Sequence, residues 1–264
     1  MPPEIDAEKL RISVRGYVPV DEPLTVRMER IMAEIASLPD EAVSYDPDAH
    51  VLTVDYTRVP GWEERLRERV QVVRIGERIV ITPPWEHYAP QQDEIVLVID
   101  PGHTFGSGLH ETTRLCAEAL PRWLHPGDRA IDLGTGTGIL AMMAVKLGAC
   151  RVTAIDLLPE AVEAARDNVA RNGLESAITV RQTEGLTTEL EPADLIIANI
   201  VPEAICRYAP FIGAALSPGG RLITSGFKAI HLPELTAALQ SAGLTQYEER
   251  NDGSWLAIIA GKPE

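Results

Sequence analysis

The feature that most constrains this chain is residues 131–140, which read Ile-Asp-Leu-Gly-Thr-Gly-Thr-Gly-Ile-Leu. The pattern predicts a short apolar strand, a turn that contains Gly134, Gly136 and Gly138, and the start of an apolar helix. Glycine is the residue that lets so tight a turn bring its backbone against a ligand. Because the first N–H groups of the helix point back at the turn, they favour an anionic or polar ligand there.

A carboxylate follows at the end of the next predicted strand. This strand covers Cys150–Ile155 and ends at Asp156, which lies 22 positions after Gly134. A carboxylate at such a strand end can accept hydrogen bonds from both hydroxyls of a ribose. The turn and Asp156 together predict a site for a nucleoside cofactor. The alternative is a glycine-rich turn that binds no ligand.

The glycine spacing separates two classes of cofactor. The dinucleotide fingerprint G-x-G-x-x-G places its third glycine at position 139, where this chain has Ile139. The spacing found, G-x-G-x-G preceded by Asp132, resembles motif I of the class I S-adenosylmethionine (SAM) methyltransferases. The resemblance implies SAM as the cofactor, whereas the spacing alone argues only against an NAD(P)-binding oxidoreductase.

Residues 125–264 alternate between strand and helix patterns, which predicts an α/β fold with a doubly wound parallel sheet. The strand expected over Asp194–Ile200 is a nearly unbroken apolar run, which is typical of a central parallel strand. The methyltransferase resemblance implies seven strands with an antiparallel edge, formed by a closing hairpin of residues 246–250 and 255–260. The other strands are expected over 129–133, 152–155, 178–181 and 221–224, and the helices over 112–124, 137–147, 159–172, 202–216 and 232–242.

The first part of the chain has a different pattern. Residues 1–60 predict a small α+β domain, of a kind that more often docks a substrate than carries out chemistry. Residues 61–98 predict a connector with a short charged helix over 61–70 and a hairpin formed by 72–75 and 78–81. The methyltransferase domain is expected over residues 99–264.

A second glycine-rich stretch covers residues 100–113 and leads into a predicted helix. Its segment Phe-Gly-Ser-Gly-x-His-x-Thr-Thr, from Phe105 to Thr113, resembles the signature Phe-Gly-Thr-Gly-x-His-x-Thr-Thr of the ribosomal protein L11 methyltransferases. The resemblance is carried by residues 99–264 and is weak over 1–60. His103 and His110 have no third ligand at a suitable spacing, so no metal site is predicted.

Ligands of open α/β sheets lie beyond the carboxyl ends of the strands, and we expect the site at this edge. The glycine turn is assigned to the methionine part of SAM and Asp156 to its ribose. Glu184, after the third strand, is assigned to the adenine, with a solvated loop residue as the alternative. The family resemblance implies that Thr113 contacts the cofactor.

Asn199 is expected at the end of the fourth strand, where amine-modifying methyltransferases also place an asparagine. Its side-chain oxygen can accept an N–H of a substrate amine and aim the nitrogen lone pair at the methyl group. Asn199 is therefore predicted to contact the cofactor and to act in catalysis. The alternative is a turn residue that closes the strand.

Charge and composition limit the partners. The net charge of −15 and a pI of about 4.9 argue against direct binding of nucleic acid and favour a basic partner. We find no signal peptide and no apolar run near the ~20 residues that span a bilayer, which predicts a cytoplasmic protein without membrane contact. A monomer is expected. Cys116, Cys150 and Cys206 each lie beside apolar residues and are predicted to be buried free thiols.

The leading hypothesis is a SAM-dependent protein N-methyltransferase that modifies amino groups, of a lysine side chain or an N-terminus, in ribosomal protein L11. The family resemblance supplies this substrate. One alternative keeps the chemistry but changes the substrate to another protein lysine or a small-molecule amine. Two others are an NAD(P)-binding oxidoreductase and a scaffold that binds SAM without catalysis.

Overall fold

The computed structural model describes residues 70–100, 106, 108, 110–183 and 191–264. The chain divides into two units, Met1–Arg58 and Val59–Glu264, and all described residues belong to the second. The predicted α+β domain over 1–60 and nearly all of the predicted helix over 61–70 therefore lie outside the described residues. The domain boundaries stay a prediction.

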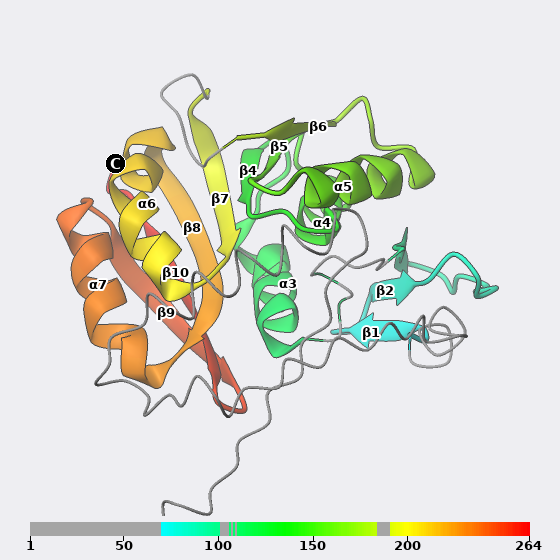
Figure 1. Ribbon diagram of the computed structural model, residues 1–264, viewed down its shortest axis with the longest axis horizontal. Coiled ribbons are helices and arrows are strands. Elements are labelled where there is room, and N and C mark those ends of the chain that lie inside the picture. Colours follow the sequence, from blue (N-terminus) through cyan, green and yellow to red (C-terminus); the bar gives the residue numbers. More distant parts are fainter. Residues whose placement is uncertain (1–69, 101–105, 107, 109, 184–190) are drawn as a thin grey trace, which may run out of the picture. The chain divides into compact units, whose positions relative to one another are not determined.

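A mixed sheet of seven strands forms the centre of the described structure, in the order β6-β5-β4-β7-β8-β10-β9 (Figure 1). The pairs from β6 to β8 are parallel, whereas β10 is antiparallel to both of its neighbours, β8 and β9. The predicted doubly wound sheet with a closing hairpin is thus confirmed. Its strands are β4 (Arg129–Leu133), β5 (Arg151–Asp156), β6 (Ile178–Gln182), β7 (Ala193–Asn199), β8 (Leu216–Lys228), β9 (Thr245–Asp252) and β10 (Trp255–Gly261).

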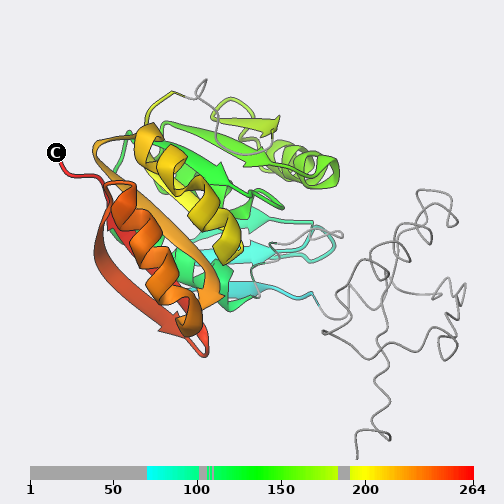
Figure 2. The ribbon, with the colours of Figure 1, turned by 60° about the vertical axis from the view of Figure 1, so that its left-hand side comes forward.

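Helices cover both faces of the sheet because its central strands are apolar on both sides. In β7, Leu195 and Ile197 join one hydrophobic cluster, which includes α3 and α4. Ile196 and Ala198 point the other way and join the cluster of α6 and α7, which lie side by side on their face (Figure 2). The helices are α3 (Glu111–Trp123), α4 (Ile139–Lys146), α5 (Pro159–Arg171), α6 (Pro202–Ala215) and α7 (Leu232–Ser241).

A second sheet of three strands, β1 (Val73–Ile75), β2 (Ile79–Thr82) and β3 (Ile95–Val98), precedes α3. β1 and β2 form the predicted antiparallel hairpin, and β3 adds a parallel partner to β2 that the sequence analysis did not predict. Ile81 and Leu97 are buried in the same cluster as α3 and α4. This small sheet therefore shares its core with the large one.

The predicted turn at Ser217–Gly220 is an irregularity within β8. Ala193 of β7 pairs with Leu216, but Leu195 pairs with Arg221, so four residues of β8 stand opposite one residue of β7. Such an insertion bends a strand away from its partner locally. The strand that was expected to begin at Arg221 therefore begins earlier, at Leu216.

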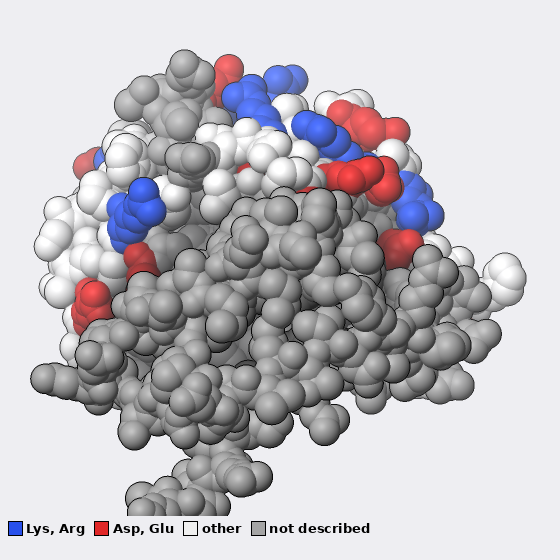
Figure 3. Space-filling view, in the orientation of Figure 1, with Lys and Arg blue, Asp and Glu red and all other residues white. Residues whose placement is uncertain are grey.

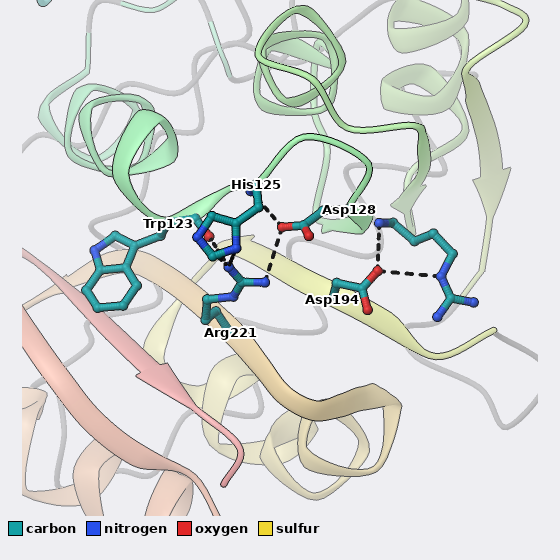
Figure 4. A network of polar contacts seen from close by, with 6 residues as sticks. Trp123, His125, Asp128, Asp194 and Arg221 are labelled. Atoms are coloured by element: carbon teal, nitrogen blue, oxygen red, sulfur yellow. Dashed lines mark hydrogen bonds and ion pairs between the residues drawn. The ribbon is translucent and has the colours of Figure 1, made fainter. Parts of the chain in front are cut away.

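Arg221 of β8 holds the segment that follows α3 (Figure 4). Its guanidinium donates to the Trp123 carbonyl at 3.0 Å, contacts Nδ1 of His125, and lies 3.3 Å from Oδ2 of Asp128. Asp128 also accepts the His125 N–H at 2.8 Å. The side chains of Arg221 and Asp128 are only 12% and 11% exposed. This nearly buried ion pair fixes the end of α3 opposite to the one that carries Thr113.

Acidic and basic side chains lie next to one another on the described surface near α5 (Figure 3). The surface over this helix is therefore not a continuous acidic patch, although the chain as a whole is negatively charged. The charged residues of α5 are Glu160, Glu163, Arg166, Asp167 and Arg171.

Within the described residues, no helix has the length and apolarity needed to span a bilayer.

The three cysteines differ in exposure. Cys116 in α3 is buried as predicted, Cys206 in α6 is partly exposed, and Cys150 is exposed. The prediction of a buried thiol is therefore not met by Cys206, which is only partly buried, and is wrong for Cys150. Cys150 is exposed because it lies just before β5, at the amino end of this strand. There its N–H donates to the Asp128 carbonyl at 2.9 Å, and its side chain faces solvent.

Candidate active site

The glycine turn connects β4 to α4 at the carboxyl edge of the large sheet. The N–H groups of Gly134 and Thr135 donate to the Ile155 carbonyl of β5, at 2.8 and 2.9 Å. Gly134, Gly136 and Gly138 have φ angles of 74°, 55° and 82°. Residues with a side chain rarely adopt such angles. The backbone of the turn therefore explains the glycine at each of these three positions.

Gly134 also meets the loop that follows β7. A Cβ atom at Gly134 would lie 2.3 Å from Cγ2 of Ile200, far inside contact distance. Ile200 comes directly after Asn199, and its N–H donates to the Ser225 carbonyl of β8 at 3.2 Å. The turn and the predicted catalytic residue are thus neighbours at this edge.

Asp156 ends β5 beside the turn, as predicted. Its Oδ2 accepts the Gly136 N–H at 2.9 Å, and its Oδ1 accepts the Leu158 N–H at 3.1 Å. Because each carboxylate oxygen has two lone pairs, both oxygens can accept a second hydrogen bond. Asp156 is partly exposed. The carboxylate therefore holds the turn and can still accept from a ribose.

The first turn of α4 suits an anionic group. Gly138 precedes this helix with a left-handed backbone and has no side chain to cap it. Asp132 accepts the Ala141 N–H from beneath the turn. The earlier N–H groups of such a helix start favour a carboxylate or a similar anion. These donors and Asp156 fit a nucleoside cofactor that also carries an amino-acid carboxylate.

Asp132 is a buried carboxylate beneath the turn. Its Oδ2 accepts the Thr135 hydroxyl at 2.7 Å and the Ala141 N–H at 3.1 Å, whereas its Oδ1 has no hydrogen-bond partner among the described residues. Burial raises the pKa of Asp132 to about 6, although these two hydrogen bonds oppose the shift. The side chain is 1% exposed, so it connects the turn to α4 rather than presenting a charge to a ligand.

Asn199 and Thr113 come together at the carboxyl edge, although they lie 86 positions apart in the sequence. Asn199 ends β7, and its Nδ2 lies 3.4 Å from Oγ1 of Thr113. Thr113 is buried in the first turn of α3. Because the amide nitrogen faces this hydroxyl, the amide oxygen is left to accept from a substrate. Two predicted site residues are thus in direct contact.

His110 fixes the start of α3. Its Nδ1 accepts the Thr112 N–H at 3.3 Å and lies 2.8 Å from the Thr112 hydroxyl oxygen. Its ring meets the ring of Trp255 edge-on, with centroids 5.0 Å apart, and Nζ of Lys228 lies 5.1 Å from the Trp255 centroid. His110 thus serves as a helix cap. In the described parts of the chain, no three metal-ligating side chains gather.

Two asparagines, one in α5 and one just after it, contact the segment before α3, and neither was predicted from the sequence to do so. Asn172 accepts the Val98 N–H at 2.9 Å and donates to the Val98 carbonyl at 2.7 Å. Asn168 does the same for Asp100, at 2.8 and 3.1 Å. Their i, i+4 spacing places both on one helix face and is the only signal the sequence offered.

One predicted site residue, Glu184, which was assigned to the adenine, lies outside the described residues. His103 and Phe105 of the glycine-rich stretch, which were not assigned to the site, lie outside them too. The assignment of Glu184 stays a prediction. The described members of the site are Thr113, Gly134, Gly136, Gly138, Asp156 and Asn199, all at the carboxyl edge of the sheet.

Comparison with known proteins covers nearly the whole chain. The family model described as "Ribosomal protein L11 methyltransferase (PrmA)" matches residues 4–263. A ribosomal protein L11 methyltransferase of Symbiobacterium thermophilum is 39% identical over 255 residues, 96% of this chain and 81% of that protein. One of Pelotomaculum thermopropionicum is 38% identical over 250 residues, 94% and 78% of the two chains. The match includes most of residues 1–60, where the sequence analysis found only a weak resemblance.

A solved structure agrees with these matches. The crystal structure of a ribosomal protein L11 methylase from Lactobacillus delbrueckii subsp. bulgaricus superposes with a TM-score of 0.68 at 32% sequence identity. The alignment covers 74% of this chain and 98% of that chain. The similarity therefore extends from the sequence to the fold.

Proposed function

The chain belongs to the ribosomal protein L11 methyltransferase family and is a protein methyltransferase of class I fold, and on this premise we propose its cofactor, substrate and site residues. It transfers methyl groups from SAM to amino groups of ribosomal protein L11, on a lysine side chain, at the N-terminus, or on both. The observation that carries the proposal is the Asn199–Thr113 pair next to the glycine turn.

In this proposal, different residues at the carboxyl edge bind different parts of SAM. The N–H groups at the start of α4 bind the carboxylate of its methionine part, and the glycines let the backbone come close. Asp156 accepts the ribose hydroxyls with the lone pairs that Gly136 and Leu158 leave free. Thr113 contacts the cofactor from α3, and Glu184 contacts the adenine. When bound, SAM supplies a methyl group on a sulfonium, which is activated for direct transfer.

Asn199 orients the substrate amine. Its amide nitrogen is engaged by Thr113, so its amide oxygen accepts an N–H of the amine and directs the nitrogen lone pair at the methyl carbon. The amine must be neutral to react, and a site that excludes water lowers the pKa of an ammonium. Orientation of this kind can supply roughly 7–11 kcal/mol of a reaction barrier. The site therefore needs no strong protein base.

The proposal also covers where the enzyme acts and what it binds. We place the enzyme in the cytoplasm as a monomer, acting on a basic protein substrate and without direct binding of nucleic acid. The net charge of −15 supports attraction to a basic partner.

The test incubates the full-length enzyme with SAM that carries a labelled methyl group and with purified L11. Mass spectrometry of L11 then locates each added methyl group. Label on amino groups of L11, added much more slowly by Asn199→Ala, is the expected result. Label in another protein of a cell extract, or only in its small-molecule fraction, with none in purified L11, would overturn the substrate but keep the chemistry.

A further inference from the structure

Thr137, the residue between Gly136 and Gly138, connects the glycine turn to the segment before α3. Its hydroxyl donates to the Gly106 carbonyl at 2.7 Å. Its own carbonyl accepts Nδ2 of Asn168 at 3.0 Å. Thr137 and Asn168 are both fully buried. Thr137 thus makes two hydrogen bonds to residues that lie outside the turn.

The contact at Gly106 depends on the absence of a side chain there. Gly106 has a φ of 114°, and a Cβ atom on it would lie 2.5 Å from Oγ1 of Thr137. The contact therefore needs both residue types. Thr137 supplies the hydroxyl, and Gly106 leaves the space that the hydroxyl occupies.

The bond to Asn168 continues to a second point of the same segment. Nδ2 of Asn168 also donates to the Asp100 carbonyl at 3.1 Å, and its Oδ1 accepts the Asp100 N–H at 2.8 Å. Thr137 is therefore fixed directly to Gly106 and, through one buried side chain, to Asp100. These contacts fix two residues that precede α3, Asp100 and Gly106, to the glycine turn.

The segment held in this way ends at residues of the active site. His110 lies four positions after Gly106 and caps α3, and Thr113 in the first turn of that helix contacts Asn199. A shift of Gly106 relative to the turn would move the start of α3 relative to the turn. Misplacement by about 1 Å can slow a reaction about 100-fold, and any contact that Thr113 makes with a ligand would shift by the same distance.

We propose that Thr137 and Asn168 are positioning residues, which hold the segment leading to Thr113 in place against the glycine turn and thereby set the affinity for SAM. The inference rests on the proposed function, because it requires SAM at the turn. Neither side chain is assigned a contact with SAM or with the substrate.

The test uses Thr137→Val, which keeps the branched shape but leaves the Gly106 carbonyl without its donor. We expect the Kd for SAM, measured by isothermal titration calorimetry, to rise about tenfold, as for the loss of one buried hydrogen bond. Thr137→Ser restores the hydroxyl and is expected to bind within about twofold of wild type.

Thr224→Val is the matched control. Thr224 is also fully buried, and its hydroxyl donates to the Ala198 carbonyl at 2.8 Å inside the sheet. Both valine variants should lower the melting temperature, but only Thr137→Val should weaken SAM binding. If Thr224→Val raises the Kd as much, the effect is general destabilisation and the inference is wrong.

A double variant tests transmission through α3. If Thr137 acts by placing Thr113, the Kd changes of Thr113→Val and Thr137→Val are not multiplicative in the double variant. Multiplicative changes, or a Thr137→Val protein that binds SAM as wild type does, overturn the inference. A wild-type protein that binds no SAM would instead overturn the proposed function.

Discussion

The amide nitrogen of Asn199 lies 3.4 Å from the hydroxyl oxygen of Thr113, and this pair joins the end of β7 to the first turn of α3. The hydroxyl engages the donor side of the amide and leaves the acceptor side for a substrate amine. We expect Asn199→Ala to lower kcat on the order of 100-fold, because the amine loses its orientation. The Kd for SAM, measured by calorimetry, should change much less.

Thr113→Val examines the orientation of the amide itself. It keeps the volume of threonine but removes the hydroxyl, so the Asn199 amide can rotate. At saturating SAM we expect a smaller loss of kcat than for Asn199→Ala, and Thr113→Ser should recover it. An Asn199→Ala enzyme with full activity would mean that another group orients the amine.

Asp156→Ala should weaken SAM binding by about 1–3 kcal/mol, the cost of losing hydrogen bonds to a charged acceptor. Part of this loss comes from the turn, since Asp156 also accepts the Gly136 N–H. Calorimetry with SAM measures it. Glu160→Ala removes an exposed carboxylate nearby in α5 and serves as the control. Equal losses in both variants would show a general charge effect instead of a bond to the ribose.

Gly134→Ala should destabilise the protein for two separable reasons. The left-handed backbone costs a residue with a Cβ roughly 1–2 kcal/mol, and the new methyl group would collide with Cγ2 of Ile200, adding about 1–3 kcal/mol. Urea unfolding of Gly134→Ala, Ile200→Ala and the double variant separates the two. We expect the double variant to recover the collision cost but not the backbone cost. No recovery would mean that Ile200 does not set this packing.

The order of strands and helices over 110–264 was predictable because each element has a local signal. β7 is a nearly unbroken apolar run, and its residues alternate between the clusters on the two faces of the sheet. β3 was missed for a physical reason. It pairs parallel to β2, so no hairpin turn joins them, and a four-residue apolar strand looks like part of a connector.

The site was predictable where the backbone dictates residue type, and not where distant side chains meet. Three turn positions have a left-handed backbone that favours glycine. Asp156 was predictable because it stands at the end of an apolar strand pattern, where a carboxylate can accept from a ribose. The bonds from Asn168 to Asp100 and from Thr137 to Gly106 cross 68 and 31 positions of sequence. Asparagine and threonine occur on many helices and turns without such roles, so these contacts have no clear signature in a single sequence.

Arg221→Met should lower the free energy of unfolding by about 3 kcal/mol, because it leaves the nearly buried Asp128 carboxylate without its cation. Arg129→Met is the matched control. Arg129 lies 3.5 Å from Asp194, but its side chain is 44% exposed, so about 0–1 kcal/mol is expected. Urea unfolding measures both. Similar small losses would mean that the network in Figure 4 adds little to the anchoring of α3.

Asp132 should make stability fall as the pH rises through the weakly acidic range. Burial raises its pKa from 3.8 to about 6 in the folded protein. Below about pH 4 the carboxyl is protonated in both states, but at higher pH only the unfolded chain ionises it freely. Its contribution to stability therefore declines between about pH 4 and 7, by on the order of 3 kcal/mol for a shift of about two units.

Urea unfolding of wild type and Asp132→Asn from pH 4 to 8 measures this decline. The stability of the variant relative to wild type should rise up to about pH 7 and stay constant from there to pH 8. Asp194→Asn is the control of opposite sign, because burial is outweighed by hydrogen bonds and by Arg129, which keep the pKa of Asp194 below its usual 3.8. Its difference from wild type should be flat above pH 5. A flat difference for Asp132→Asn as well would show that the carboxyl beneath the turn ionises as it does in water.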